Sequence, residues 1–113
     1  MKVLVVHRQE SVLQNVKDQL GQWHVETYSN GLEGLMAAKM TKFDLILCGQ
    51  NLPVVTCIEV VRSIRNLSAN QRTPVILLAE GNETKEHTRI YELLNANLMT
   101  MEEVSEMRNL EIE

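Results

Sequence analysis

The chain has 113 residues, 44% of them hydrophobic and 23% charged, with a formal net charge of −4. These values are typical of one ordinary globular domain with its own core, and they do not indicate a disordered chain. Acidic residues outnumber basic ones, which argues against nonspecific nucleic-acid binding by this domain. We therefore expect residues 1–113 to form a single domain.

Membrane insertion and secretion are not indicated. No apolar run reaches the roughly 18 residues that a membrane-spanning helix needs. The first ten residues contain only a short apolar run, and charge follows it, unlike a secretion signal. The two cysteines, Cys48 and Cys57, are too few for a disulfide scaffold. We expect a cytoplasmic protein with no membrane contact.

The first part of the chain alternates between strand and helix patterns. Residues 3–6 form a continuous β-branched apolar run, typical of a strand covered on both faces. Between residues 10 and 20 the apolar residues recur at helical spacing, and Gly21 suits a helix C-cap. Residues 23–28 alternate, which favours a short, partly exposed strand.

The middle of the chain repeats the alternation. Ser29 or Asn30 caps a second predicted helix. Its predicted inward residues are Leu32, Leu35, Met36 and Met40. Residues 43–47 read as the third strand, and a third helix follows Leu52-Pro53. The predicted buried residues of that helix are Ile58, Val61 and Ile64.

The last part of the chain completes five strand–helix pairs. After a polar turn at 66–70, residues 73–78 form the fourth strand, with a proline tolerated near its start. Residues 84–94 look helical, residues 97–100 form a weak strand, and residues 101–110 form a short acidic helix. This alternation predicts an α/β fold with an open, mostly parallel sheet and helices on both faces.

Several pieces of the chain fall in a familiar order. They are residues 3–6, 28–35, 43–47, Leu52-Pro53, Glu59, Ile64-Arg65 and 73–76. Their spacing resembles the response-regulator receiver domain of two-component signalling, from about Lys2 to Thr100. The resemblance implies a flavodoxin-like (CheY-like) three-layer α/β/α sandwich. Its five-stranded parallel sheet would have the order 2-1-3-4-5, flanked by five helices.

The residues that carry the family's chemistry are replaced in this chain. The family transfers a phosphoryl group to a strand-end Asp with the help of Mg²⁺. The reaction needs an acidic pair to hold the cation, and a hydroxyl and a Lys to stabilise phosphoryl charge. The acidic pair falls on His7 and Arg8, the acceptor on Gly49, the hydroxyl on Ala79 and the Lys on Met101. The aromatic switch residue falls on Leu98, and the family's Asp-Gly pair on Thr56-Cys57.

These replacements imply a pseudo-receiver. Gly49 has no side chain to phosphorylate, and Arg8 places a cation where a divalent metal would sit. We expect no catalytic residue, no metal and no cofactor, and no enzyme activity, because no nucleophile–base pair is suggested. The predicted function is phosphorylation-independent protein–protein interaction.

A docking surface is expected on the fourth helix, fifth strand and fifth helix, where the family often contacts partners. The partner would be another protein or a second copy of the chain. The predicted surface residues are Tyr91, Leu98, Met99, Glu102 and Glu103. The two glutamates also suit the N-terminus of a helix, because they complement its dipole.

Other roles stay open. The cleft at the strand ends could bind a small anion or a nucleotide, as such clefts commonly do, and His7 and Arg8 would serve an anion there. No glycine-rich phosphate loop supports a nucleotide. Cys48 and Cys57 could form a redox pair, but cytoplasmic cysteines are usually reduced.

Overall fold

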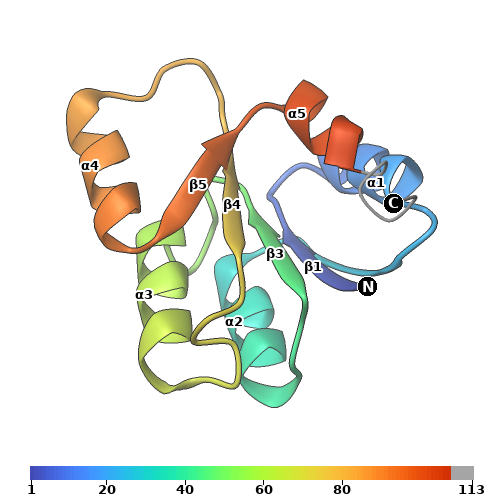
Figure 1. Cartoon of the computed structure of the whole chain (residues 1–113), viewed down its shortest axis with the longest axis horizontal. Coiled ribbons are helices and arrows are strands. Elements are labelled where there is room, and N and C mark those ends of the chain that lie inside the picture. The colour runs from blue at the N-terminus through green and yellow to red at the C-terminus, as the bar shows by residue number, and fades with distance from the viewer. Residues whose placement is uncertain (108–113) are drawn as a thin grey trace.

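The structure of the protein is a computed structural model that describes residues 1–107, apart from the side chain of Leu67. Within this range five strands alternate with five helices (Figure 1). The strands are β1 (Lys2–Val6), β2 (His24–Tyr28), β3 (Leu45–Cys48), β4 (Val75–Leu78) and β5 (Ala96–Met99). The helices are α1 (Glu10–Gln19), α2 (Gly31–Met40), α3 (Cys57–Leu67), α4 (Lys85–Leu93) and α5 (Met101–Glu106).

The sheet has the predicted topology. All neighbouring strands are parallel, in the order β2-β1-β3-β4-β5. The predicted fold class and strand order are therefore confirmed. Several element ends differ from the predicted bounds by one or two residues. Helix α1 has Leu20 as its C-cap, so Gly21 lies one residue beyond the cap. Residues 108–110 of the last predicted helix lie outside the described range.

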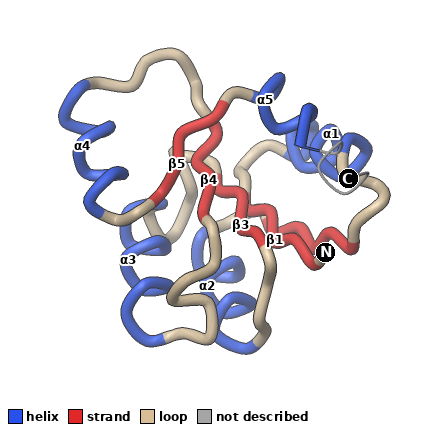
Figure 2. Tube along the Cα trace, viewed as in Figure 1, coloured by secondary structure: helices blue, strands red, loops and turns tan. Residues whose placement is uncertain are grey.

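Helices cover both faces of the sheet (Figures 1 and 2). One core lies between the sheet and α2, α3 and α4, and the other lies between the sheet and α1 and α5. Leu4 and Val6 of β1 point into the first core, and Val3 and Val5 into the second. The inner strands are thus buried on both faces, which explains their continuous apolar runs.

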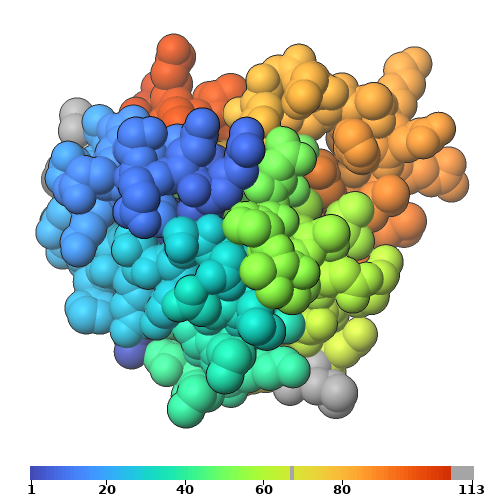
Figure 3. All heavy atoms as spheres, turned by 180° about the vertical axis from the view of Figure 1, so that it is seen from behind, coloured from blue at the N-terminus to red at the C-terminus, as the bar shows by residue number. Residues whose placement is uncertain are grey.

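Helix α2 packs on the sheet with a different face from the predicted one. Its buried residues are Gly31, Gly34, Leu35 and Ala38. The expectation was wrong for Leu32, Met36 and Met40, which are 44%, 54% and 82% exposed. A Cβ on Gly34 would lie 2.4 Å from Cγ2 of Val6, so the helix backbone sits directly on β1 and only small residues fit. The opposite, apolar side of α2 lies at the molecular surface (Figure 3, teal).

The third helix matches its predicted face more closely. Val61 and Ile64 are buried as expected, whereas Ile58 is half-buried. Cys57 and Val60 complete the buried face. None of the helices within residues 1–107 has the length and apolar character needed to cross a bilayer.

Two polar side chains hold the amino-terminal ends of the strands in place. Asn70, fully buried in the predicted polar turn, accepts the Phe43 N–H at 2.8 Å and donates to the Thr41 carbonyl at 2.8 Å. The Arg65 guanidinium donates to four carbonyl oxygens, those of Gln71, Thr73, Leu94 and Asn95. These contacts satisfy backbone groups that would otherwise lack partners. They brace the end of the sheet opposite the carboxyl ends of the strands.

The close approach of α2 to β1 can be tested with Gly34→Ala. The added methyl group forces Val6 or the helix to move, so we expect the free energy of unfolding to fall by about 1–3 kcal/mol. The loss should appear despite the higher helix propensity of alanine. Urea denaturation followed by circular dichroism measures it.

The matched control is Gly21→Ala, whose Cβ would have Asp18 O as its nearest neighbour at 3.5 Å, an ordinary contact. We expect this change to alter stability by less than about 0.5 kcal/mol. Equal stability of Gly34→Ala and the wild type would contradict the packing described.

Candidate functional site

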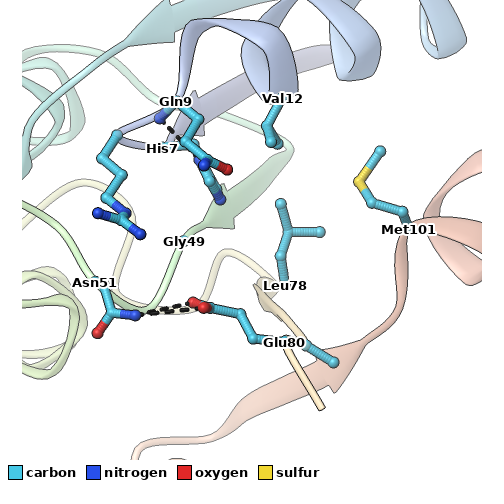
Figure 4. Close-up of a pocket in the computed structure, with 10 residues that line it drawn as sticks. His7, Gln9, Val12, Gly49, Asn51, Leu78, Glu80 and Met101 are labelled. Carbon is cyan, nitrogen blue, oxygen red and sulfur yellow. Dashed lines mark hydrogen bonds between the residues drawn. The ribbon is translucent and has the colours of Figure 1, made fainter. Parts of the chain in front are cut away.

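A cavity of about 180 Å³ lies at the carboxyl ends of the strands (Figure 4). Among its lining residues are all five predicted positions: His7, Arg8, Gly49, Ala79 and Met101. The other lining residues are Gln9, Val12, Asn51, Leu78 and Glu80. We call this cavity the strand-end cleft. It joins the turn after β1, the loop after β3, the end of β4 and the start of α5.

The strand register brings these positions together. Val6 pairs with Cys48, so the next residues of the two strands, His7 and Gly49, lie side by side. The Gly49 N–H donates to the Val6 carbonyl at 2.7 Å and keeps the strands paired to their last residue. Ala79 follows β4 at the same edge, and its N–H donates to the carbonyl of Met99 on β5 at 2.8 Å.

The His7 imidazole covers Gly49. A Cβ on Gly49 would lie 2.5 Å from Cδ2 and 3.2 Å from Nε2 of the ring. A side chain at position 49 would therefore need the space that the ring already occupies. The His7 residue is only 9% exposed. The imidazole of His7, packed on the backbone of Gly49, thus forms the floor of the strand-end cleft.

The ring of His7 is neutral in this arrangement. The Gln9 N–H donates to Nδ1 at 3.1 Å, so Nδ1 acts as an acceptor and Nε2 carries the proton. Burial is the main cause that lowers the pKa of His7 below its ordinary value. The negative charge of Glu80 opposes this lowering of the pKa, and the positive charge of Arg8 adds to it.

The charged residues of the cleft are not paired with each other. Arg8 is exposed and makes no hydrogen bond or ion pair with any residue of the described range 1–107. The carboxylate of Glu80 accepts from Nδ2 of Asn51, with both oxygens at 3.3 Å (Figure 4). A cation and an anion therefore face the same small space from different loops.

A second set of contacts links the cleft loops to α4. Gln50 Nε2 donates to the Leu78 carbonyl at 2.9 Å and to Glu83 Oε2 at 2.6 Å. Its Oε1 accepts from the Tyr91 hydroxyl at 2.7 Å. A backbone hydrogen bond from Glu80 is the main cause that lowers the pKa of Glu83, which keeps this carboxylate charged as an acceptor. Gln50 therefore connects the loops after β3 and β4 with the fourth helix.

The predicted interaction residues lie in different environments. Tyr91 is 4% exposed and packs in the core, so it does not lie on the surface as expected, because its hydroxyl turns inward to Gln50. Leu98 and Met99 are half-buried on β5. Glu102 and Glu103 are exposed, and Glu103 caps α5 by accepting the Thr100 N–H at 3.0 Å.

An apolar residue of the same region was not anticipated. Leu93, at the end of α4, is 79% exposed. The 84–94 pattern alone did not single it out, because leucine near a helix end usually packs inward.

The cysteines and possible metal ligands offer no further chemistry. Cys48 and Cys57 are both buried and free, and burial raises the pKa of Cys48 to about 12. Burial also raises the pKa of Cys57, so both sulfurs stay protonated and unreactive near neutral pH. Within residues 1–107 no group of three or more His, Cys, Asp or Glu side chains is placed to hold a metal ion.

The lowered pKa of His7 gives a pH prediction. The unfolded chain takes up a proton on this histidine at a higher pH than the folded chain does. Stability from His7 is therefore present above its unfolded pKa and is lost as the pH falls through that value toward the folded pKa. We expect the wild type to lose more free energy of unfolding than His7→Gln between about pH 7.5 and pH 5.5. Urea titrations at each pH measure the difference, and parallel curves would contradict a buried, neutral His7.

The chain is similar to known proteins over most of its length. A family model described as the response regulator receiver domain matches residues 3–101. The cell cycle transcriptional regulator CtrA of Caulobacter vibrioides is 32% identical over 85 residues, which cover 74% of this chain and 36% of that protein. The probable transcriptional regulator ycf29 of Porphyra purpurea is 30% identical over 71 residues, 63% of this chain and 34% of that one. The chain spans about a third of the length of these curated relatives.

Solved structures agree with the family model. The chemotaxis protein CheY4 of Vibrio cholerae, crystallised at low pH, is 28% identical, with a TM-score of 0.83. The similarity covers 98% of this chain and 96% of that one. Together with the strand order β2-β1-β3-β4-β5, the match over residues 3–101 shows that the chain belongs to the response regulator receiver domain family of two-component signalling.

Proposed function

We propose that this chain is a pseudo-receiver, a single receiver-like unit that acts by phosphorylation-independent protein–protein interaction. The contact between His7 and Gly49 carries the proposal. An acceptor carboxylate at the end of β3 would project from position 49, and the imidazole of His7 fills that space. A phosphoryl group would have neither an acceptor oxygen nor room beside β3.

The residues of the cleft do not fit the family's magnesium ion. Mg²⁺ binds oxygen ligands, chiefly carboxylates and water. Among the described lining residues, Glu80 supplies the single carboxylate, and Asn51 already donates to it. Arg8 adds a positive charge that repels a divalent cation. The lining residues of the cleft therefore do not suit Mg²⁺.

The remaining support comes from the family and from the surface around β5. Receiver domains bind partner proteins and form homodimers. In the described sheet, β5 is an edge strand, which pairs only with β4 and leaves backbone groups open on its outer side. Leu93 is exposed beside it, and Leu98 and Met99 are partly accessible. We propose the face formed by α4, β5 and α5 as the docking surface.

A second role is favoured by the state of Arg8. This guanidinium lines the cleft without a partner among residues 1–107. The free guanidinium of Arg8, beside the imidazole of His7, suits the binding of a small anion. A nucleotide is less suitable, because the sequence has no glycine-rich loop to hold its phosphates. This role does not exclude docking through α4, β5 and α5.

Phosphorylation independence can be tested directly. We expect acetyl phosphate, or beryllofluoride with Mg²⁺, to leave the amide NMR spectrum of the wild type unchanged. The amide NMR spectrum of Gly49→Asp alone should also be unchanged by these reagents, because the His7 ring still occupies the space beside position 49. A phosphoryl adduct detected on the wild-type chain by mass spectrometry would contradict the proposal.

The positive control rebuilds the family's chemical groups in the same scaffold. It combines H7D, R8D, G49D, A79T and M101K. Each change supplies a group that the family's reaction needs, and H7D also removes the imidazole. We expect this variant to respond to beryllofluoride and Mg²⁺, which would show that the assay detects a competent cleft.

The docking surface can be tested through Leu93. If a second copy docks on the face formed by α4, β5 and α5, Leu93→Glu should weaken self-association about tenfold, because a charge replaces an exposed apolar contact. Sedimentation equilibrium over a range of protein concentrations measures the effect. Met40→Glu is the matched control, because Met40 is equally exposed but lies on α2. Weakening by the control change alone would place the interface on α2 instead.

A further inference from the structure

One polar atom at the wall of the cleft has no hydrogen-bond partner within residues 1–107. The Nδ1 atom of His7 accepts from Gln9, which leaves the proton on Nε2. No hydrogen bond joins Nε2 to another residue of the described chain. The ring points into the space between Gly49 and Leu78 (Figure 4). The His7 residue is 9% exposed and lines the cavity, so this N–H donor can be reached from the cleft.

Two further features make the same wall of the cleft attractive to an anion. Gln9 is the N-cap of α1, but its side chain makes no capping hydrogen bond. In this ten-residue helix the Val12 and Leu13 N–H groups donate to the Gln9 carbonyl, so only the start of the first turn keeps N–H groups outside the helical hydrogen bonds. The Glu10 carboxylate in the same turn offsets part of the positive helix potential. Arg8, next in sequence, holds a full charge without a partner among residues 1–107.

The rest of the cleft limits the size and kind of ligand. Val12, Leu78 and Met101 form an apolar wall, and the volume is about 180 Å³. That space suits a molecule of a few carbon atoms. Glu80 adds an opposing charge, and both of its carboxylate oxygens accept from Asn51 Nδ2 at 3.3 Å. A ligand with an anionic head and an apolar body matches these walls better than an inorganic ion.

We propose that the strand-end cleft binds a small organic carboxylate. Its carboxylate accepts hydrogen bonds from Nε2 of His7 and from the guanidinium of Arg8, and its apolar part packs on Val12, Leu78 and Met101. This inference rests on the second role proposed above, anion binding in the cleft, and names the chemical class of the anion. It does not depend on the pseudo-receiver proposal.

The test is an NMR titration of the full chain with sodium butyrate. Matched arms use inorganic phosphate and sodium chloride at the same ionic strength and pH. We expect butyrate to produce saturable shifts at the amides of Gln9 and Gly49 and at the ring nitrogens of His7. The bound negative charge also favours the imidazolium, so the pKa of His7 should rise on binding. Phosphate should bind more weakly, because it leaves the apolar wall uncovered.

Variants separate the proposed contacts from general charge effects. Arg8→Gln should lower butyrate affinity about tenfold, because it removes a charged donor. Glu80→Gln should raise affinity a few-fold, because it removes the opposing charge. Arg62→Gln, the same change on the exposed face of α3, should leave affinity unaltered. A dispersed amide spectrum checks that each variant is folded.

Three results would overturn the inference. The first is the absence of a saturable butyrate response in the folded wild type. The second is an equal affinity in Arg8→Gln and the wild type. The third is phosphate binding as tight as butyrate binding, which would remove the role of the apolar wall. None of these results depends on beryllofluoride or acetyl phosphate, so failure here is distinct from failure of the pseudo-receiver proposal.

Discussion

The parallel register between β1 and β3 determines what can happen at the cleft. The pairing of Val6 with Cys48, extended by the Gly49 N–H bond to Val6, places positions 7 and 49 against each other. In such a sheet, side chains at adjacent strand ends share one space. A large residue at one position requires a small residue at the other. The imidazole at position 7 and the glycine at position 49 satisfy this requirement as a pair.

This coupling gives the cleft its chemical character. The buried ring stays neutral and offers one donor, while the exposed guanidinium of Arg8 supplies the positive charge. Glu80 sits across from them on the loop after β4. Gln50 in turn sets the position of that loop. Its side chain donates hydrogen bonds to Leu78 and Glu83 and accepts one from the Tyr91 hydroxyl. The cleft and the fourth helix are therefore parts of one hydrogen-bonded unit.

The features that could be predicted from sequence depend on local patterns. The inner strands are apolar because both faces are covered, so their runs are visible in the sequence. The five cleft positions came from the resemblance to the receiver family, and the structure brings them together.

Features that depend on long-range contacts escaped sequence reasoning. The face of α2 was mistaken because that helix is apolar on both sides, and only the contact of Gly34 with Val6 selects the buried face. Burial of Tyr91 depends on a partner 41 residues away. Asn70 likewise hydrogen-bonds to Phe43, 27 residues away in sequence, so no pattern in the neighbouring residues indicates that Asn70 is buried.

The outward orientation of Met36 and Met40 has a consequence for redox stress. Thioethers on the molecular surface meet oxidants before those in a core do, and sulfoxidation makes them polar. On α2 this change would occur where the side chains touch solvent, away from the glycine face that packs on β1. The two methionines can therefore take up oxidative damage without disturbing the packing beneath them, and reductases can reach them for repair.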